Sequence, residues 1–85
     1  MQEEMVGVII KYFSKPGVAA IEITGGSVKK GDVLKYKGHT TDFSEEVPSI
    51  ELDNQQIDEA KKGDLVGIKV KVRVRENDKV YKVVE

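Results

Sequence analysis

The chain contains no cysteine and no tryptophan, only two prolines and a single histidine. Without cysteine, a disulfide scaffold, a thiolate nucleophile and a cysteine metal ligand are all excluded. No run of residues approaches the roughly 20 consecutive apolar residues that a membrane-spanning helix needs. The acidic start, Met1 to Glu4, has no signal-peptide pattern, so we expect a cytoplasmic protein.

What is present suits one small folded domain. The chain has 85 residues, of which 39% are hydrophobic and 34% are charged with both signs represented. This composition does not indicate disorder, and the length suffices for one modest core. We therefore predict a single β-barrel domain over residues 1–85, in which residues 1–5 form a flexible N-terminal tail.

The formal net charge of −1 is an average over three unequal blocks. Residues 1–40 carry a charge of +2, residues 41–64 carry −6, and residues 65–85 carry +3. Charge blocks bear on binding and solubility more than on fold. A nearly neutral total therefore does not exclude a nucleic-acid partner.

The hydrophobic pattern is that of short β-strands almost throughout. The predicted strands are rich in β-branched residues and are separated by turn residues such as those of Ser14 to Gly17. Pro48 lacks an N–H, so its strand lies at an edge or starts late. An antiparallel sandwich or barrel follows, and at this size we favour a small closed barrel of about six or seven strands. The predicted strands are Val6–Phe13, Val18–Thr24, Val33–Lys37, Val47–Leu52, Val66–Arg75 and Val80–Val84.

The remaining segments are expected to lack strands. Residues 39–44 are polar and resemble a loop, and Asp53 to Lys62 favours one turn or an ordered loop rather than a long helix. The run Lys29-Lys30-Gly31-Asp32 recurs as Lys61-Lys62-Gly63-Asp64, 32 residues later. We interpret this echo as one turn type used twice, with glycine at positive φ and aspartate accepting a backbone N–H.

The strongest candidate site lies on the alternating segment near the C-terminus. Its apolar residues alternate strictly with Lys69, Lys71, Arg73 and Arg75. On one strand these cations would form a line on the order of 20 Å long. Such a line can follow a polyanion backbone, or it can be an ordinary solvated face paired with acids. A hairpin turn at residues 76–79 is expected to return the chain along this strand.

Signals for chemistry are weak. Gly26 and Gly31 have the glycine spacing of a phosphate-binding loop, but Asp32 follows where that motif needs lysine, and no helix is expected. His39 has no partner in a zinc-binding pattern, and a triad drawn with Ser44 or Ser49 lacks a nucleophile-elbow sequence. We predict that the chain is not an enzyme and binds no metal or cofactor.

Several segments follow one another in a distinctive order: Val18–Glu22, Gly26–Leu34, Gly38, Val47–Glu51 and Ile57–Ile68. This order resembles that of the second domain of translational GTPases such as elongation factor Tu. It is also similar to the C-terminal barrel of collagenase-like peptidases that are linked to RNA modification. The resemblance implies a Greek-key β-barrel of the translation-protein type and a setting near RNA. The resemblance does not imply GTP hydrolysis, because the nucleotide-binding domain is absent. It also assigns no tRNA-binding role to any residue, because Ile21 stands where the elongation factor usually has glycine.

Two functions follow as expectations. The first is a non-enzymatic, translation-factor-like module that binds RNA or an RNA-containing complex, with Lys69, Lys71, Arg73 and Arg75 on phosphates. The alternative is a protein–protein adaptor that supplies the barrel in trans to a GTPase or peptidase-like partner. In that case the acidic segment Asp42 to Asp64 would serve as a contact surface as readily as the basic one.

Overall fold

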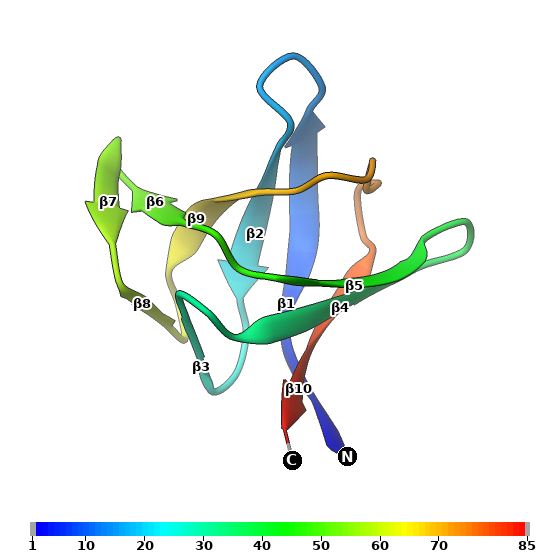
Figure 1. Cartoon of the computed structure of the whole chain (residues 1–85), viewed down its shortest axis with the longest axis horizontal. Coiled ribbons are helices and arrows are strands. Elements are labelled where there is room, and N and C mark those ends of the chain that lie inside the picture. Colours follow the sequence, from blue (N-terminus) through cyan, green and yellow to red (C-terminus); the bar gives the residue numbers. More distant parts are fainter. Residues whose placement is uncertain (1, 85) are drawn as a thin grey trace.

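A computed structural model describes residues 2–84, which form ten strands and no helix, so the predicted all-β antiparallel class is confirmed. Eight strands make one antiparallel sheet in the order β5-β4-β10-β1-β2-β9-β6-β7, and β3 pairs with β8 as a separate ribbon (Figure 1). The strands are β1 (Gln2–Phe13), β2 (Val18–Ile23), β3 (Ser27–Lys29), β4 (Val33–Lys37), β5 (Asp42–Glu46), β6 (Ile50–Leu52), β7 (Gln55–Ile57), β8 (Glu59–Lys61), β9 (Leu65–Lys69) and β10 (Lys79–Val84).

The large sheet coils strongly, so that β4 and β5 pass across the direction of β1 and β2 (Figure 1). Within residues 2–84 its end strands, β5 and β7, pair with β4 and β6 and not with each other. The hydrogen-bonded sheet is therefore open, where we predicted a closed barrel. Coiling nevertheless encloses one core, because sheets twist in a fixed sense and a long sheet curls onto itself.

The core follows from strict alternation along the strands. Leu34 and Tyr36 of β4 are buried, while Lys35 is half-buried and Lys37 exposed, as the sequence predicts. Burial raises the pKa of the Tyr36 hydroxyl, and the negative charge of Glu45 adds to the effect. Buried side chains from nearly every strand complete the cluster: Val6, Ile9, Ala19, Ile21, Ile23, Val28, Val47, Ile50, Ala60, Val66, Ile68, Val70, Val74 and Val80.

The long strand β1 bends by means of two irregularities, one between Met5 and Gly7 and one between Ile9 and Lys11. Gly7 has a specific reason to be glycine. A Cβ there would lie 2.7 Å from the backbone oxygen of Glu22 and 2.9 Å from the side chain of Ile21. This close approach of β1 to β2 allows the sheet to coil at this point.

The short polar strands are absent from the sequence-based prediction. Residues 42–46 form β5 rather than continuing a loop, and the expected turn or ordered loop of Asp53 to Lys62 contains β7 and β8. Asp53 and Asn54 have φ values of 52° and 65°, and Leu52 pairs with Gln55. Two central residues at positive φ make a tight hairpin turn whose twist suits the flanking strands. The expectation for Pro48 holds, since β6 starts late, at Ile50.

The predicted strand Val66–Arg75 is wrong beyond Lys69, where β9 ends. Val70 donates its N–H to Gly17 O at 2.9 Å, and the chain then leaves the sheet until β10 starts at Lys79. The expected hairpin with β10 cannot form, because β1 and β2 lie between β9 and β10 in the sheet. The chain must instead cross over these strands, and Val72 becomes exposed on the way.

Both ends of the described chain lie side by side. Residues 2–5, which we predicted as a flexible tail, belong to β1, and Gln2 to Met5 pair with Val84 to Tyr81 (Figure 1). Their backbone groups find ladder partners in the last strand, which stabilises an extended conformation. Met1 lies outside the described residues.

The echoed turn is confirmed. Lys29 and Lys61 donate their backbone N–H to Oδ2 of Asp32 and Asp64, at 2.8 and 2.9 Å. The glycine before each aspartate has φ near +95°, at +94° and +96°. Each turn leads directly into a strand, β4 or β9.

The same turn occurs a third time, with asparagine in place of glycine. Arg75 donates its N–H to Asp78 Oδ2 at 2.8 Å, Asn77 has φ 71°, and β10 follows. Asparagine tolerates positive φ better than other non-glycine residues, so the substitution is allowed. We missed this copy because it shares only the aspartate and the basic first residue with the others.

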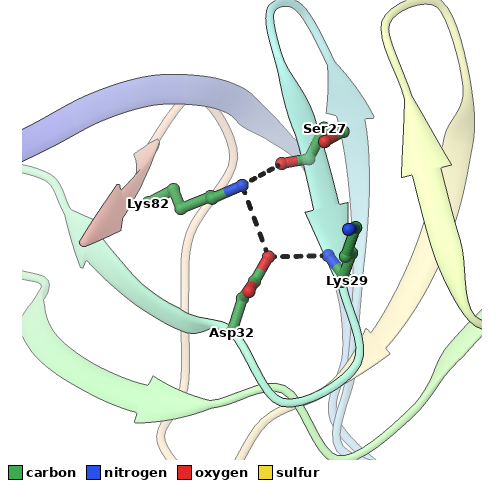
Figure 2. A network of polar contacts seen from close by, with 4 residues as sticks. All are labelled: Ser27, Lys29, Asp32 and Lys82. Carbon is green, nitrogen blue, oxygen red and sulfur yellow. Dashed lines mark hydrogen bonds and ion pairs between the residues drawn. The ribbon is translucent and has the colours of Figure 1, made fainter. Parts of the chain in front are cut away.

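The first of these turns is also connected to the last strand (Figure 2). Lys82 of β10 donates from Nζ to Ser27 O at 3.1 Å and lies 3.6 Å from Asp32 Oδ2. One aspartate oxygen therefore serves both the turn and an ion pair. The contact joins the C-terminal strand to the β3–β4 connection.

Candidate functional site

An open groove of about 990 Å³ lies where the end of β5 faces the end of β9. Three stretches of chain form it: the β3–β4 turn, the end of β5 with the residues after it, and the segment from Lys69 to Lys71. Asp58 completes the wall. The lining residues are Lys29, Lys30, Gly31, Glu45, Glu46, Val47, Pro48, Asp58, Lys69, Val70 and Lys71.

Hydrogen bonds hold the walls of this groove in place. Lys71 donates its backbone N–H to the Glu45 carboxylate, at 3.1 and 3.3 Å to its two oxygens. Gly31 and Lys30 donate their N–H groups to Val47 O and Asp58 O, both at 3.0 Å. The lysines are thus carried on a connected backbone frame, although their side chains extend from it.

The groove carries charges of both signs, with a small excess of positive side chains. Its lining includes four lysines against three acids, Glu45, Glu46 and Asp58, with buried Val47 and Val70 beside them. Glu45 is engaged by the N–H of Lys71, which leaves it less available to oppose a bound anion. The arrangement can hold a polyanion backbone by point charges, without geometry that reads sequence.

The predicted site residues separate into two groups. Lys69 and Lys71 line the groove, whereas Arg73 and Arg75 are not among its lining residues, although all four side chains are exposed. Only Lys69 lies on a strand, so the predicted straight line of cations does not exist. The line is interrupted because β9 ends at Lys69, and beyond this residue the alternation no longer places side chains on a common face.

Lys29 and Lys30 are the groove residues that sequence reasoning missed as a site. They lie in the echoed turn, which we interpreted only as structural. The signal was present, since two adjacent lysines occur in each copy, but nothing in the sequence places the first copy beside Lys69 and Lys71. Residues 45–47 join these segments in the folded chain, because Glu45 accepts the N–H of Lys71 and Val47 O accepts the N–H of Gly31.

The other residues considered for chemistry in the sequence include the glycine pair Gly26 and Gly31, His39 and the acidic side chains. Gly26 and Gly31 flank strand β3 and the turn after it, with no helix following, as predicted. His39 is exposed in the turn between β4 and β5. Residues 2–84 contain no group of three or more histidine, cysteine, aspartate or glutamate side chains placed to hold a metal ion. The described part of the chain also has no helix able to cross a membrane.

The fold and the groove define an antiparallel β module with a lysine-lined groove. No family model matches the chain. It is similar over 82 residues, at 40% identity, to a collagenase from Porphyromonas gingivalis, and at 38% over 77 residues to an uncharacterized protease from Methanocaldococcus jannaschii. These alignments cover 95% and 89% of this chain.

Solved structures agree on the fold. The C-terminal domain of a Geobacillus thermoleovorans protein assigned to the U32 peptidases matches with a TM-score of 0.88 at 20% identity, covering 95% of this chain and 93% of that one. GDP-bound aIF5B from Aeropyrum pernix matches with a TM-score of 0.68 at 18% identity, covering 98% of this chain and 14% of that one. Both predicted resemblances, to collagenase-like peptidase barrels and to translational GTPases, are therefore confirmed.

The chain spans about a fifth of the length of the curated relatives, 23% of the collagenase and 19% of the protease. The similarity thus concerns one module of longer proteins.

Proposed function

We propose that this chain is a non-enzymatic β module that contacts RNA, or an RNA-containing complex, through its lysine-lined groove. It acts in the cytoplasm and holds no cofactor or nucleotide of its own. One observation carries the proposal: Lys29, Lys30, Lys69 and Lys71, distant in sequence, line one groove.

The groove can accommodate a phosphate backbone. It is open, and flexible lysines supply its positive charge, so it can follow a chain of phosphates without enclosing a ligand. Arg73 and Arg75 are exposed along the segment that leaves the groove and would extend the same track. The fold similarity to aIF5B adds support, because that protein is a translational GTPase.

The test is a titration of a fluorescein-labelled 20-nucleotide oligouridine, and separately of mixed tRNA, at several KCl concentrations. Neutralising four phosphates of a single strand gives a slope of log K against log salt of about −2.8. Replacing Lys29, Lys30, Lys69 and Lys71 with glutamine should abolish binding at moderate salt. Replacing Lys69, Lys71, Arg73 and Arg75 instead should weaken it, since two groove lysines remain.

The matched control carries four glutamines elsewhere, at Lys11, Lys35, Lys37 and Lys79, and has the same net charge as the groove variant. It should retain most of the affinity. Absence of salt-dependent binding by the unmodified chain contradicts the proposal, and so does an equal loss in the groove variant and the control. Circular dichroism and thermal unfolding of each variant establish that the fold is intact.

A second function is favoured by the sequence similarity. An alignment covering 95% of this chain, and only 23% of the collagenase, fits a module that works beside a peptidase-type domain. In this chain that would mean a protein–protein adaptor. Purification of the chain from its native cells after nuclease treatment tests it: a stoichiometric peptidase-like protein should remain bound, and its absence contradicts the adaptor function.

A further inference from the structure

A patch of apolar side chains covers the outer face of three adjacent strands, β4, β10 and β1. Met5 pairs with Tyr81, and Tyr81 pairs in turn with Lys35, while Val83 lies one row further, opposite Glu3. These residues alternate with the buried Val80, Leu34 and Tyr36, so they face away from the core. The outer apolar patch consists of Met5, Val8, Val33, Tyr81 and Val83.

Exposure of this kind is unusual on the solvent side of an antiparallel sheet, which normally carries polar residues. Met5 and Val33 have exposed fractions of 44% and 40%, and Val8, Tyr81 and Val83 are half-buried. Single exposed apolar residues need no explanation, but a contiguous group on neighbouring strands marks a contact surface. A tyrosine at its centre is typical of protein–protein contacts.

The charges at the rim indicate the character of the partner. Lys35 of β4 is paired with Glu3 of β1 at 3.4 Å, across the outer face of β10 between Tyr81 and Val83, so this ion pair lies within the patch and is neutral as a whole. Lys37 and Lys79 lie directly opposite each other on β4 and β10, on the outer face, and neither forms an ion pair within residues 2–84. Like charges directly opposite on a sheet repel, and Asp42, opposite Lys37 on β5, is the acid nearest in register. An acidic surface brought over this pair would relieve the repulsion.

The position of the chain ends gives a second indication of which partner binds the patch. Gln2 and Val84 pair at the same end of β1 and β10 that carries Glu3, Met5 and Val83 (Figure 1). In the relatives, about four-fifths of the length lies outside the matched module. A domain joined to this fold through either end therefore emerges beside the outer apolar patch.

We infer that the outer apolar patch is the docking surface for a folded domain of the peptidase type, with an apolar centre and an acidic rim. The inference deepens the adaptor function proposed above and rests on it. The groove lies at the ends of β5 and β9 and shares no residue with this patch, so one chain can bind RNA and a protein at once.

Site-specific photo-crosslinking in the native cells tests the assignment. Benzoylphenylalanine is introduced at Tyr81 in the patch, at Pro48 in the groove, and at Leu65, an exposed residue of β9. Adducts are identified by mass spectrometry after nuclease treatment. We expect a peptidase-like protein crosslinked from position 81 and not from positions 48 or 65.

The outcomes separate the two proposals. A peptidase-like adduct from position 48 or 65, but not from 81, overturns the docking surface and leaves the adaptor function standing. A second copy of this chain as the main adduct from position 81 also overturns it. No peptidase-like adduct from any position, combined with none on purification, overturns the adaptor function itself.

Charge reversal gives an independent measure that does not depend on the crosslinker. Lys79→Glu should lower recovery of the partner at least about tenfold, because a rim charge acts on association with an acidic surface. Lys15→Glu, an equal change of charge on an exposed residue in the turn between β1 and β2, should leave recovery nearly unchanged. Equal recovery with both variants contradicts the acidic rim.

Discussion

At the scale of single residues, Tyr36 shows how position changes chemistry. It is 1% exposed and stacks on Phe43 with ring centroids 4.8 Å apart. Burial disfavours the phenolate and raises its pKa, and the nearby Glu45 carboxylate opposes the same negative charge. The hydroxyl therefore stays neutral in the folded chain over a wider pH range than in the unfolded chain.

This difference predicts loss of stability in alkali. The pKa of tyrosine in an unfolded chain is about 10, and the folded value is higher, so folding favours the neutral form. Its contribution is fully present below pH about 10 and is lost as pH rises above that value. Urea unfolding of the wild type between pH 8 and 11 should show this decline, and Tyr36→Phe should flatten it. Parallel decline in both proteins would contradict the assignment.

Val72 and Val74 show the limit of sequence reasoning at the same scale. The strict alternation predicts one common face for both residues. In the structure Val74 is 1% exposed and Val72 is 49% exposed. The pattern assumes a continuous strand, and once β9 ends at Lys69 the direction of each side chain depends on where the crossing segment meets the core. Beyond the same break, Lys71 still lines the groove with Lys69, whereas Arg73 and Arg75 do not.

At the scale of elements, the aspartate turn is the recurring part. It precedes β4, β9 and β10, and in each copy the aspartate carboxylate accepts the N–H of the residue three positions earlier. The chain thus enters three strands with the same geometry. Two copies were predictable because lysine, glycine and aspartate recur together. The copy with Asn77 adopts the same conformation with a different sequence.

The first two turns form a matched pair for mutagenesis. Asp64→Ala should lower the free energy of unfolding by about 1 kcal/mol through loss of one N–H acceptor. Asp32→Ala should cost roughly 0.2–1 kcal/mol more, because it also removes the ion pair with Lys82, whose side chain is 21% exposed. Urea denaturation measures both effects.

The double-mutant cycle gives the decisive control for this pair. In a Lys82→Met background the excess cost of Asp32→Ala over Asp64→Ala should disappear. An excess that persists there would mean that the Lys82 contact contributes nothing and that the two turns differ for another reason.

At the scale of the whole molecule, the pairing of β1 with β10 joins the two ends of the described chain. The groove and the outer apolar patch lie on different parts of the molecule, and the turn joined to Lys82 forms one wall of the groove. The blocks of charge seen along the sequence are partly mixed in space, since Glu45, Glu46 and Asp58 of the acidic block line the groove together with four lysines. The net charge of a block therefore does not describe any one surface.

Deletion of residues 1–4 tests the role of this end pairing. It removes three backbone pairs with β10 and the ion pair of Glu3 with Lys35. We expect the free energy of unfolding to fall by about 1–3 kcal/mol, since each net backbone hydrogen bond is worth about 0.5–1.5 kcal/mol. Glu3→Gln, which keeps the backbone, should cost less than about 0.5 kcal/mol. If the truncated chain were as stable as the full one, the result would support the flexible tail that the sequence predicted and contradict the role of the end pairing.

The sequence by itself determined the class of fold and most of its long strands, because β-branched alternation and glycine or aspartate turns act locally. It also carried the resemblance that the comparisons confirm. It left out the short strands β3, β5, β7 and β8, whose residues are mostly polar and become strands only through their partners.

Only the tertiary structure decided where β9 ends, which strand β10 pairs with, and which lysines share a groove. The physical reason is that these features depend on strand order. With β1 and β2 between β9 and β10, the chain must cross over them. Lys69 at the end of β9 and Lys71 at the start of the crossing lie beside the turn that carries Lys29 and Lys30.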